Sequence, residues 1–124
     1  MNRFKAWLCT WSIPEFKYLD SDQRFEVYDG FIKYNLSLKQ VKVYALERVN
    51  YETMRVIKKA LAKGISCRDM EICRDMDISD WRLARVVEGL LSGIDGEDIL
   101  KYLDPNISDS EAFRIFSEVI HQKK

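Results

Sequence analysis

Oxygen-bearing side chains alternate in one short segment of the chain, at Asp75, Asp77 and Ser79. Such alternation begins the loop that wraps a calcium ion, in which a glycine follows at the sixth position and a bidentate glutamate at the twelfth. In this chain those two positions hold Asp80 and Val86. We therefore predict that these oxygens form a turn and cap a helix instead of holding a metal ion.

Residues that could act as nucleophiles or zinc ligands are few. Cys9, Cys67 and Cys73 are odd in number and follow no paired spacing, and His121 is the one histidine of the chain. A zinc site or a disulfide framework needs more such residues in a closer pattern. The sequence also shows no nucleophile with a partner base and no glycine-rich phosphate loop. We expect no enzymatic activity, no cofactor and no metal.

Residues 72–86 (ICRDMDISDWRLARV) resemble a bacterial helix-turn-helix, a motif that reads DNA with its second helix. Ser79 would begin that helix, and Arg82 and Arg85 would lie on it. An aspartate replaces the usual turn glycine, however, and residues 78–106 carry three basic against six acidic side chains. A surface that contacts phosphates is normally basic. DNA binding through these three residues is therefore the alternative hypothesis.

Basic side chains gather on the polar side of the helix predicted to follow Asn50. They are Arg55, Lys58, Lys59 and Lys63. A run of this kind commonly forms a solvated helix face, but it also suits an acidic partner, protein or nucleic acid. We predict that these four residues contribute to a binding surface.

The three tryptophans are candidate anchors for a partner, because aromatic side chains dominate the energetics of interfaces. Trp7 and Trp11 lie near the amino terminus, where a core position is an equal alternative. When the chain is aligned with itself at an offset of 29 residues, the positions equivalent to Trp81 hold polar residues. This predicts that Trp81 is exposed. Trp81 is therefore the first choice as a contact residue.

Apolar residues recur along the chain with a period of 29, in stripes of positions three and four apart. This spacing is that of the buried face of an α-helix. The aligned columns are Phe25, Met54, Leu83 and Ala112; Tyr28, Ile57, Val86 and Ile115; Ile32, Leu61, Leu90 and Val119; and Leu36, Ile65 and Ile94. Each stripe predicts one long helix.

Residues that start and end helices recur at the same period. The predicted amino-terminal caps are Ser21, Asn50, Ser79 and Ser108, the last paired with Glu111 in a capping box. The predicted left-handed ends are Asn35, Gly64 and Gly93. Shorter apolar pairs between the long helices predict a short helix in each unit: Val41 with Tyr44, Met70 with Cys73 and Ile99 with Tyr102.

We therefore predict an all-α fold, a compact solenoid-like array of long-helix and short-helix units with period 29 in a single domain, 1–124. A helical cap, 1–19, precedes the array. The predicted repeats are 20–48, 49–77, 78–106 and 107–124. In the cap, Phe4, Trp7, Leu8 and Trp11 have the spacing of a short amphipathic helix that Pro14 ends. Helix pairs of this size bury their stripes by stacking on their neighbours.

Charge and hydropathy narrow the location and the partners. The 20 basic residues balance the 20 acidic ones, and 47% of the chain is hydrophobic. Charges interrupt every apolar stretch, so we expect no membrane-spanning segment and no membrane partner. The amino terminus lacks the core and cleavage site of a signal peptide. We expect a soluble, cytoplasmic protein, and these patterns leave its oligomeric state open.

The repeat is similar to short α-helical repeats in accessory proteins of Firmicutes phages and integrative elements. The matching residues are Tyr51, Met54, Ile57, Leu61, Gly64 and Ile65, and later Gly93, Ile94, Asp95, Tyr102, Asp104 and Pro105. The resemblance covers about residues 20 to 120. It implies a mobile-element protein that acts by binding, and small proteins of that origin include inhibitors of host defence nucleases such as anti-CRISPR proteins.

Two hypotheses follow from the sequence. The first is a non-enzymatic module that binds a protein partner and inhibits a host defence nuclease complex. The second is a helix-turn-helix transcriptional regulator that binds DNA.

Overall fold

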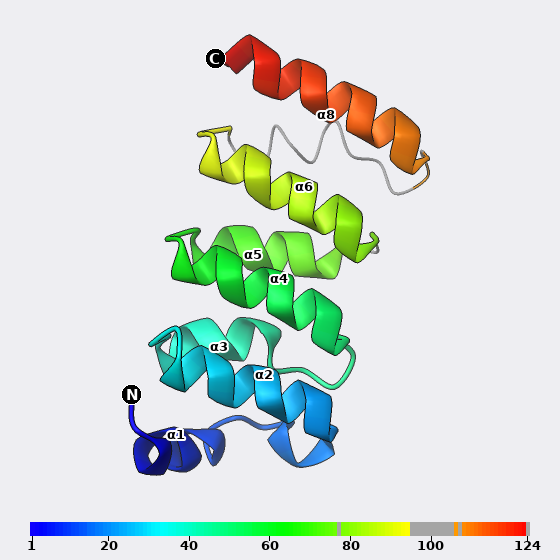
Figure 1. The fold of residues 1–124 in the computed structure, drawn as a ribbon. Coiled ribbons are helices and arrows are strands. Elements are labelled where there is room, and N and C mark those ends of the chain that lie inside the picture. The colour runs from blue at the N-terminus through cyan, green and yellow to red at the C-terminus, as the bar shows by residue number, and fades with distance from the viewer. Residues whose placement is uncertain (77, 95–105, 107, 124) are drawn as a thin grey trace. The chain divides into compact units, whose positions relative to one another are not determined.

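The computed structural model describes residues 1–76, 78–94, 106 and 108–123, and all regular secondary structure within these ranges is helical (Figure 1). The elements are α1 (Arg3–Thr10), the 3-10 helix η1 (Phe16–Tyr18), α2 (Ser21–Ile32), α3 (Leu38–Tyr44), α4 (Tyr51–Ala62), α5 (Cys67–Asp75), α6 (Asp80–Leu91) and α8 (Asp109–Lys123). The predicted all-α class is confirmed. None of these helices combines the length and the apolar character that crossing a bilayer requires.

The chain forms two compact units, Met1–Arg74 and Asp75–Lys124. In the first unit α2 packs against α1, α3 and α4, and α3 also packs against α4. Helices α2 and α4 run in the same direction because α3 and the loop after it carry the chain back (Figure 1). The core of this unit is made of apolar side chains from α2 to α5: Val27, Phe31, Val41, Tyr44, Met54, Ile57, Leu61, Met70 and Cys73.

In the second unit α6 packs against α8. Leu83 and Val86 of α6 are buried, as is Ala112 of α8. The short helix predicted around Ile99 and Tyr102 lies outside the described residues, as does Asp77. The predicted core positions Leu83 and Val86 of α6 are thus confirmed, whereas Leu90 of the same stripe is half-buried.

Helix starts follow the predicted cap chemistry at three of four positions. The side-chain oxygen of Asn50 accepts the backbone N–H of Thr53 at 2.8 Å. Ser79 and Ser108 accept the N–H groups three residues ahead of them, each at 3.2 Å. These contacts satisfy N–H groups that a helix leaves free at its start. The Glu111 carboxylate, the predicted partner of Ser108 in a capping box, also bonds to Arg114.

The prediction that Ser21 caps α2 is wrong. Asp20 is the cap: its carboxylate accepts the Gln23 N–H at 2.8 Å, and the Gln23 side chain accepts the Asp20 N–H at 2.9 Å. A capping box closed on both sides satisfies more backbone groups than one serine hydroxyl does. Helix α2 therefore begins one residue earlier than the 29-residue period predicts.

This shift changes which face of α2 is buried. The predicted stripe of Phe25, Tyr28 and Ile32 is wrong for this helix, since Phe25 is 61% exposed and Ile32 is 38% exposed. Val27 and Phe31 are buried in their place. One residue turns a helix by about 100°, so a single-residue offset moves an entire stripe away from the core.

The turn that follows α2 is one residue longer than the turn that follows α4. The predicted left-handed ends are confirmed, with φ of +52° at Asn35, +97° at Gly64 and +91° at Gly93. After α4 the Ile65 N–H reaches back five residues to a carbonyl, whereas after α2 the Leu36 N–H reaches back six, to Gly30 at 2.9 Å. The wider turn restores the 29-residue spacing at the helix end.

Candidate functional site

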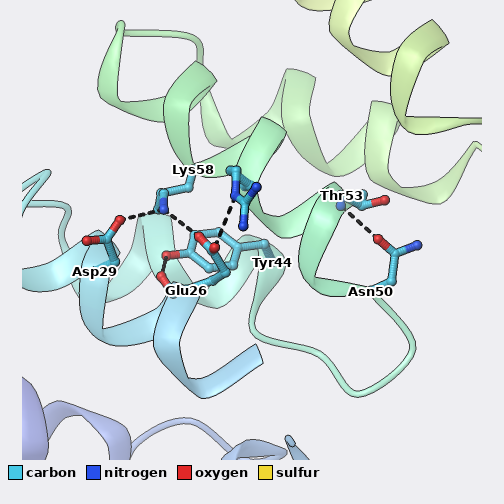
Figure 2. Close-up of polar contacts among 7 residues, drawn as sticks. Glu26, Asp29, Tyr44, Asn50, Thr53 and Lys58 are labelled. Atoms are coloured by element: carbon cyan, nitrogen blue, oxygen red, sulfur yellow. Dashed lines mark hydrogen bonds and ion pairs between the residues drawn. The ribbon is translucent and has the colours of Figure 1, made fainter. Parts of the chain in front are cut away.

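The basic side of α4 is smaller than the sequence predicts, because Lys58 is buried. Its side chain is 3% exposed and pairs with two carboxylates of α2, Glu26 and Asp29, the latter at 2.6 Å (Figure 2). The Nε of Arg55 lies 3.3 Å from Glu26 Oε1. The expectation that Lys58 faces solvent is therefore wrong. Two cations and two carboxylates balance each other between the helices, which allows all four charges to lie there.

A signal for this cluster is present in the sequence. Glu26 and Asp29 are three residues apart on α2, and Arg55 and Lys58 are three apart on α4. Each acid is 29 residues from its base, so opposite charges share two columns of the repeat. Reading the columns for charge as well as for hydropathy identifies the pairs.

Tyr44 completes the interior of the first unit. Its hydroxyl donates to the Glu26 carbonyl at 2.8 Å, and burial together with the carboxylates of Glu26 and Asp29 raises the pKa of the phenol well above its usual range. The ring lies against Gly30, where an added Cβ would stand 2.1 Å from the Tyr44 hydroxyl oxygen. The hydroxyl therefore stays protonated and acts as a fixed donor.

The cysteines of the first unit are free thiols. Cys73 is buried, and burial, with a smaller contribution from Asp69, raises the pKa of its thiol to about 11. The thiol is therefore protonated at neutral pH and is a poor nucleophile. In the part of the chain that the structure describes, no three His, Cys, Asp or Glu side chains come together as a metal site would require.

The predicted anchor Trp81 lies on the surface of the second unit, 43% exposed. Its ring is 5.9 Å from that of Phe113, which is 46% exposed. The guanidinium carbon of Arg85 stands 5.5 Å from the centre of each ring, and its Nη1 is 3.0 Å from Glu88. We call Trp81, Arg85 and Phe113 the α6–α8 aromatic cluster. With Ser110 they line an open hollow on the surface.

Phe113 is a surface aromatic that the sequence reasoning missed. It stands one position after the apolar column that contains Ala112. An aromatic residue outside the buried columns is the signal that singled out Trp81, and the same test applied to the last unit identifies Phe113. The two rings come from different helices, so only the packing of α6 on α8 brings them together.

Two of the three residues proposed for DNA binding do not offer a free side chain to a duplex. Arg82 is 4% exposed, so the expectation that α6 presents it on the surface is wrong. Ser79 caps α6 with its hydroxyl. Arg85 is partly exposed but stacks on two rings and pairs with Glu88. Arg82 lies on the face of α6 that packs inward with Leu83 and Val86.

Helix α1 forms where the sequence predicts an amphipathic helix, but its apolar side chains are exposed. The exposed fractions are 68% for Phe4, 46% for Trp7, 45% for Leu8 and 74% for Trp11. The side buried against the rest of the unit carries Ala6 and Thr10. A small residue such as Ala6 allows the helix backbone to approach closely, which leaves the large side chains on the outside. The helix ends at Thr10, before Pro14.

The remaining predicted contact residues are exposed. Lys59 and Lys63 lie on the surface of α4, and the side chain of Arg55 is half exposed beside Tyr51. Trp7 lies on α1 and Trp11 directly after it, in the same unit as these cations. Trp81 belongs to the second unit. The predicted site residues therefore belong to two different units of the chain.

Comparison with models of known protein families, with curated proteins and with solved structures gave no significant match.

Proposed function

We propose that this chain is a non-enzymatic, cytoplasmic module that binds a protein partner. The observation that carries the proposal is the α6–α8 aromatic cluster, in which an arginine lies beside two partly exposed rings. Tryptophan, tyrosine and arginine are enriched among residues whose loss weakens protein interfaces most. Stacking restricts these side chains before a partner arrives, which reduces the entropy lost on binding.

The helical scaffold supports this function. Helices α4, α6 and α8 begin at residues 51, 80 and 109, and α4 and α6 are each 12 residues long. This regularity supports the proposed array of 29-residue units. Repeats of capped helices form rigid surfaces suited to macromolecules.

The sharper form of the proposal is inhibition of a host defence nuclease complex, in the manner of an anti-CRISPR protein. It rests on the resemblance of residues 20 to 120 to repeats of phage and mobile-element proteins. A regulator that binds DNA through α6 has less support, because Arg82 is buried and Arg85 is engaged with neighbouring groups.

An affinity pull-down of the tagged chain from bacterial lysate, with and without nuclease treatment, tests the proposal. We expect a nuclease-resistant protein partner whose recovery drops at least about tenfold for the double variant Trp81→Ala, Arg85→Ala. Phe25→Ala, which removes an exposed aromatic side chain of the first unit, is the matched control. Recovery that disappears with nuclease would favour the regulator. Absence of protection in a plasmid-interference assay would contradict the inhibitor.

A further inference from the structure

The first unit contains an aromatic groove that is separate from the α6–α8 aromatic cluster. It lies where α1, η1 and α2 meet and holds about 370 Å³. Its large side chains are Trp7, Trp11, Phe16 and Tyr28, and Ile13 and Pro14 also line it. We propose that this groove binds an acidic segment of a partner protein that inserts one or two large apolar side chains. The inference rests on the proposed function of the chain as a protein-binding module.

The groove walls are ordered by contacts within the unit. The rings of Trp7 and Trp11 meet edge to face at 5.2 Å, and those of Phe16 and Tyr28 do so at 5.8 Å. Edge-to-face pairs of this kind are a favoured aromatic geometry. Trp11 is nevertheless 74% exposed, so its ring has apolar surface to bury against a ligand. A prearranged apolar hollow with a few polar groups is the usual form of a binding site.

The charge around the groove is positive. Lys17 is its one charged lining residue. Arg24 stands 5.1 Å above the Phe16 ring and donates to the Lys17 carbonyl at 3.2 Å. Arg3 lies one turn before Trp7 on α1, and the first 14 residues of the chain contain no aspartate or glutamate. Two cations, Lys17 in the lining and Arg24 over the Phe16 ring, therefore lie at an aromatic hollow that has no acidic side chain in its lining.

The two carboxylates that flank η1 are already bonded to backbone groups. Glu15 accepts the Glu47 N–H at 3.1 Å, and Asp20 accepts the Gln23 N–H as the cap of α2. Each oxygen that holds such a bond is less able to turn toward Lys17 or Arg24. The positive charge at the groove is thus available to acidic groups of a ligand. Charge complementarity favours an acidic occupant over a neutral or basic one.

The same observations favour a peptide over a nucleic acid. A single strand is bound by a long basic track with rings that stack on successive bases. This groove has one lysine in its lining and Arg24 beside it, and the chain carries equal numbers of acidic and basic residues. A short segment with a few carboxylates and one or two apolar anchors matches the groove in size and in charge.

Selection from a displayed library of random 12-residue peptides against the full chain tests the inference. We expect the selected peptides to combine aspartate or glutamate with leucine or an aromatic residue. The affinity of each should fall at least about tenfold for Trp11→Ala and at least about threefold for Lys17→Glu. Phe25→Ala is the control, because Phe25 is 61% exposed on α2 and does not line the groove. Circular dichroism of each variant checks that the fold is retained.

The remaining outcomes each overturn the inference. Selected peptides that are basic, or an empty selection, would do so. Binding that is lost with Trp81→Ala but kept with Trp11→Ala would overturn the groove and leave the proposed protein-binding function intact. Tighter Trp11-dependent binding to a 15-nucleotide poly(dT) strand than to any selected peptide would assign the groove to nucleic acid. Dimerisation that Trp11→Ala abolishes, measured by analytical ultracentrifugation, would assign it to a second copy of the chain.

Discussion

The buried cluster between α2 and α4 and the aromatic cluster of α6 and α8 use the same types of groups in opposite environments. Each joins a cation, an aromatic ring and a carboxylate: Lys58 lies 5.0 Å from the Tyr34 ring centre, and Arg85 lies 5.5 Å from that of Trp81. The Lys58 side chain is 3% exposed, whereas that of Arg85 is 36% exposed. Water access therefore decides whether such a group holds the fold together or remains available to a partner.

Energetics explain the difference. Removing one partner of a buried ion pair leaves an uncompensated charge and costs about 3–5 kcal/mol. Solvent screens a surface pair, whose contribution is about 0–1 kcal/mol. The first cluster is therefore expected to determine stability and the second to determine binding, and variants of each can test that division.

Lys58→Met should have the largest effect, because it leaves Glu26 and Asp29 buried without their shared cation. We expect the free energy of unfolding to fall by about 3–5 kcal/mol, measured by urea denaturation followed by circular dichroism. Lys59→Met, one residue further along α4 and exposed, should change it by no more than about 0.5 kcal/mol. Equal effects of the two substitutions would contradict the structural role of Lys58.

Gly30→Ala should destabilise the first unit by about 1–3 kcal/mol, since the added Cβ would stand 2.1 Å from the Tyr44 hydroxyl oxygen. Tyr44→Phe removes that oxygen and should cost about 1 kcal/mol by itself through loss of the bond to Glu26. A double-mutant cycle in urea should show that Gly30→Ala is much less harmful when residue 44 is phenylalanine. Additive effects would mean that the two groups do not touch.

The pH dependence of stability tests a further buried group, the thiol of Cys73. Burial raises its pKa from 9.0 to about 11, so the folded chain keeps the proton at pH values where the unfolded chain releases it. This contribution to stability is present below about pH 9 and is lost as the pH rises toward 11. Between pH 8 and pH 10 the wild type should lose about 1 kcal/mol more than Cys73→Ala in urea denaturation. Identical losses would show that the thiol is not shielded.

Arg85→Met should have the smallest effect on stability, at most about 1 kcal/mol, because its ion pair with Glu88 and its ring contacts lie at the surface. The same change should weaken recovery of the protein partner in a pull-down several-fold. If Arg85→Met lowers the free energy of unfolding as much as Lys58→Met does, the proposed distinction between the two clusters is wrong.

Much of the local structure could be predicted from the sequence, and the missed parts share one cause. Asn50, Ser79 and Ser108 start helices as expected, and Gly64 and Gly93 take the left-handed backbone that ends them. These are contacts within a few residues, so nearby chemistry is enough to determine them. The buried stripes of α4 and α6 also follow from the period of their apolar residues.

The face of α2 and the position of Lys58 could not be predicted in the same way. One additional residue in the turn after α2 is enough to rotate the helix by about 100°, and the apolar pattern of Phe25, Tyr28 and Ile32 gives no sign of that rotation. Lys58 looks like a solvent-facing residue on a helical projection of α4 alone. It is buried because two carboxylates of another helix lie opposite it.

The sequence by itself therefore determined the caps of α4, α6 and α8, the left-handed residues Asn35, Gly64 and Gly93 and the all-α class, since capping bonds and apolar periodicity act over a few residues. Only the tertiary structure decided which charges are buried and which aromatic residues stay on the surface. Trp81 meets Phe113, and Trp11, directly after α1, shares a groove with Tyr28 of α2, because packing brings different helices together. Burial is a property of such neighbours, which are distant in the chain, and it separates the residues that stabilise this protein from those available to bind.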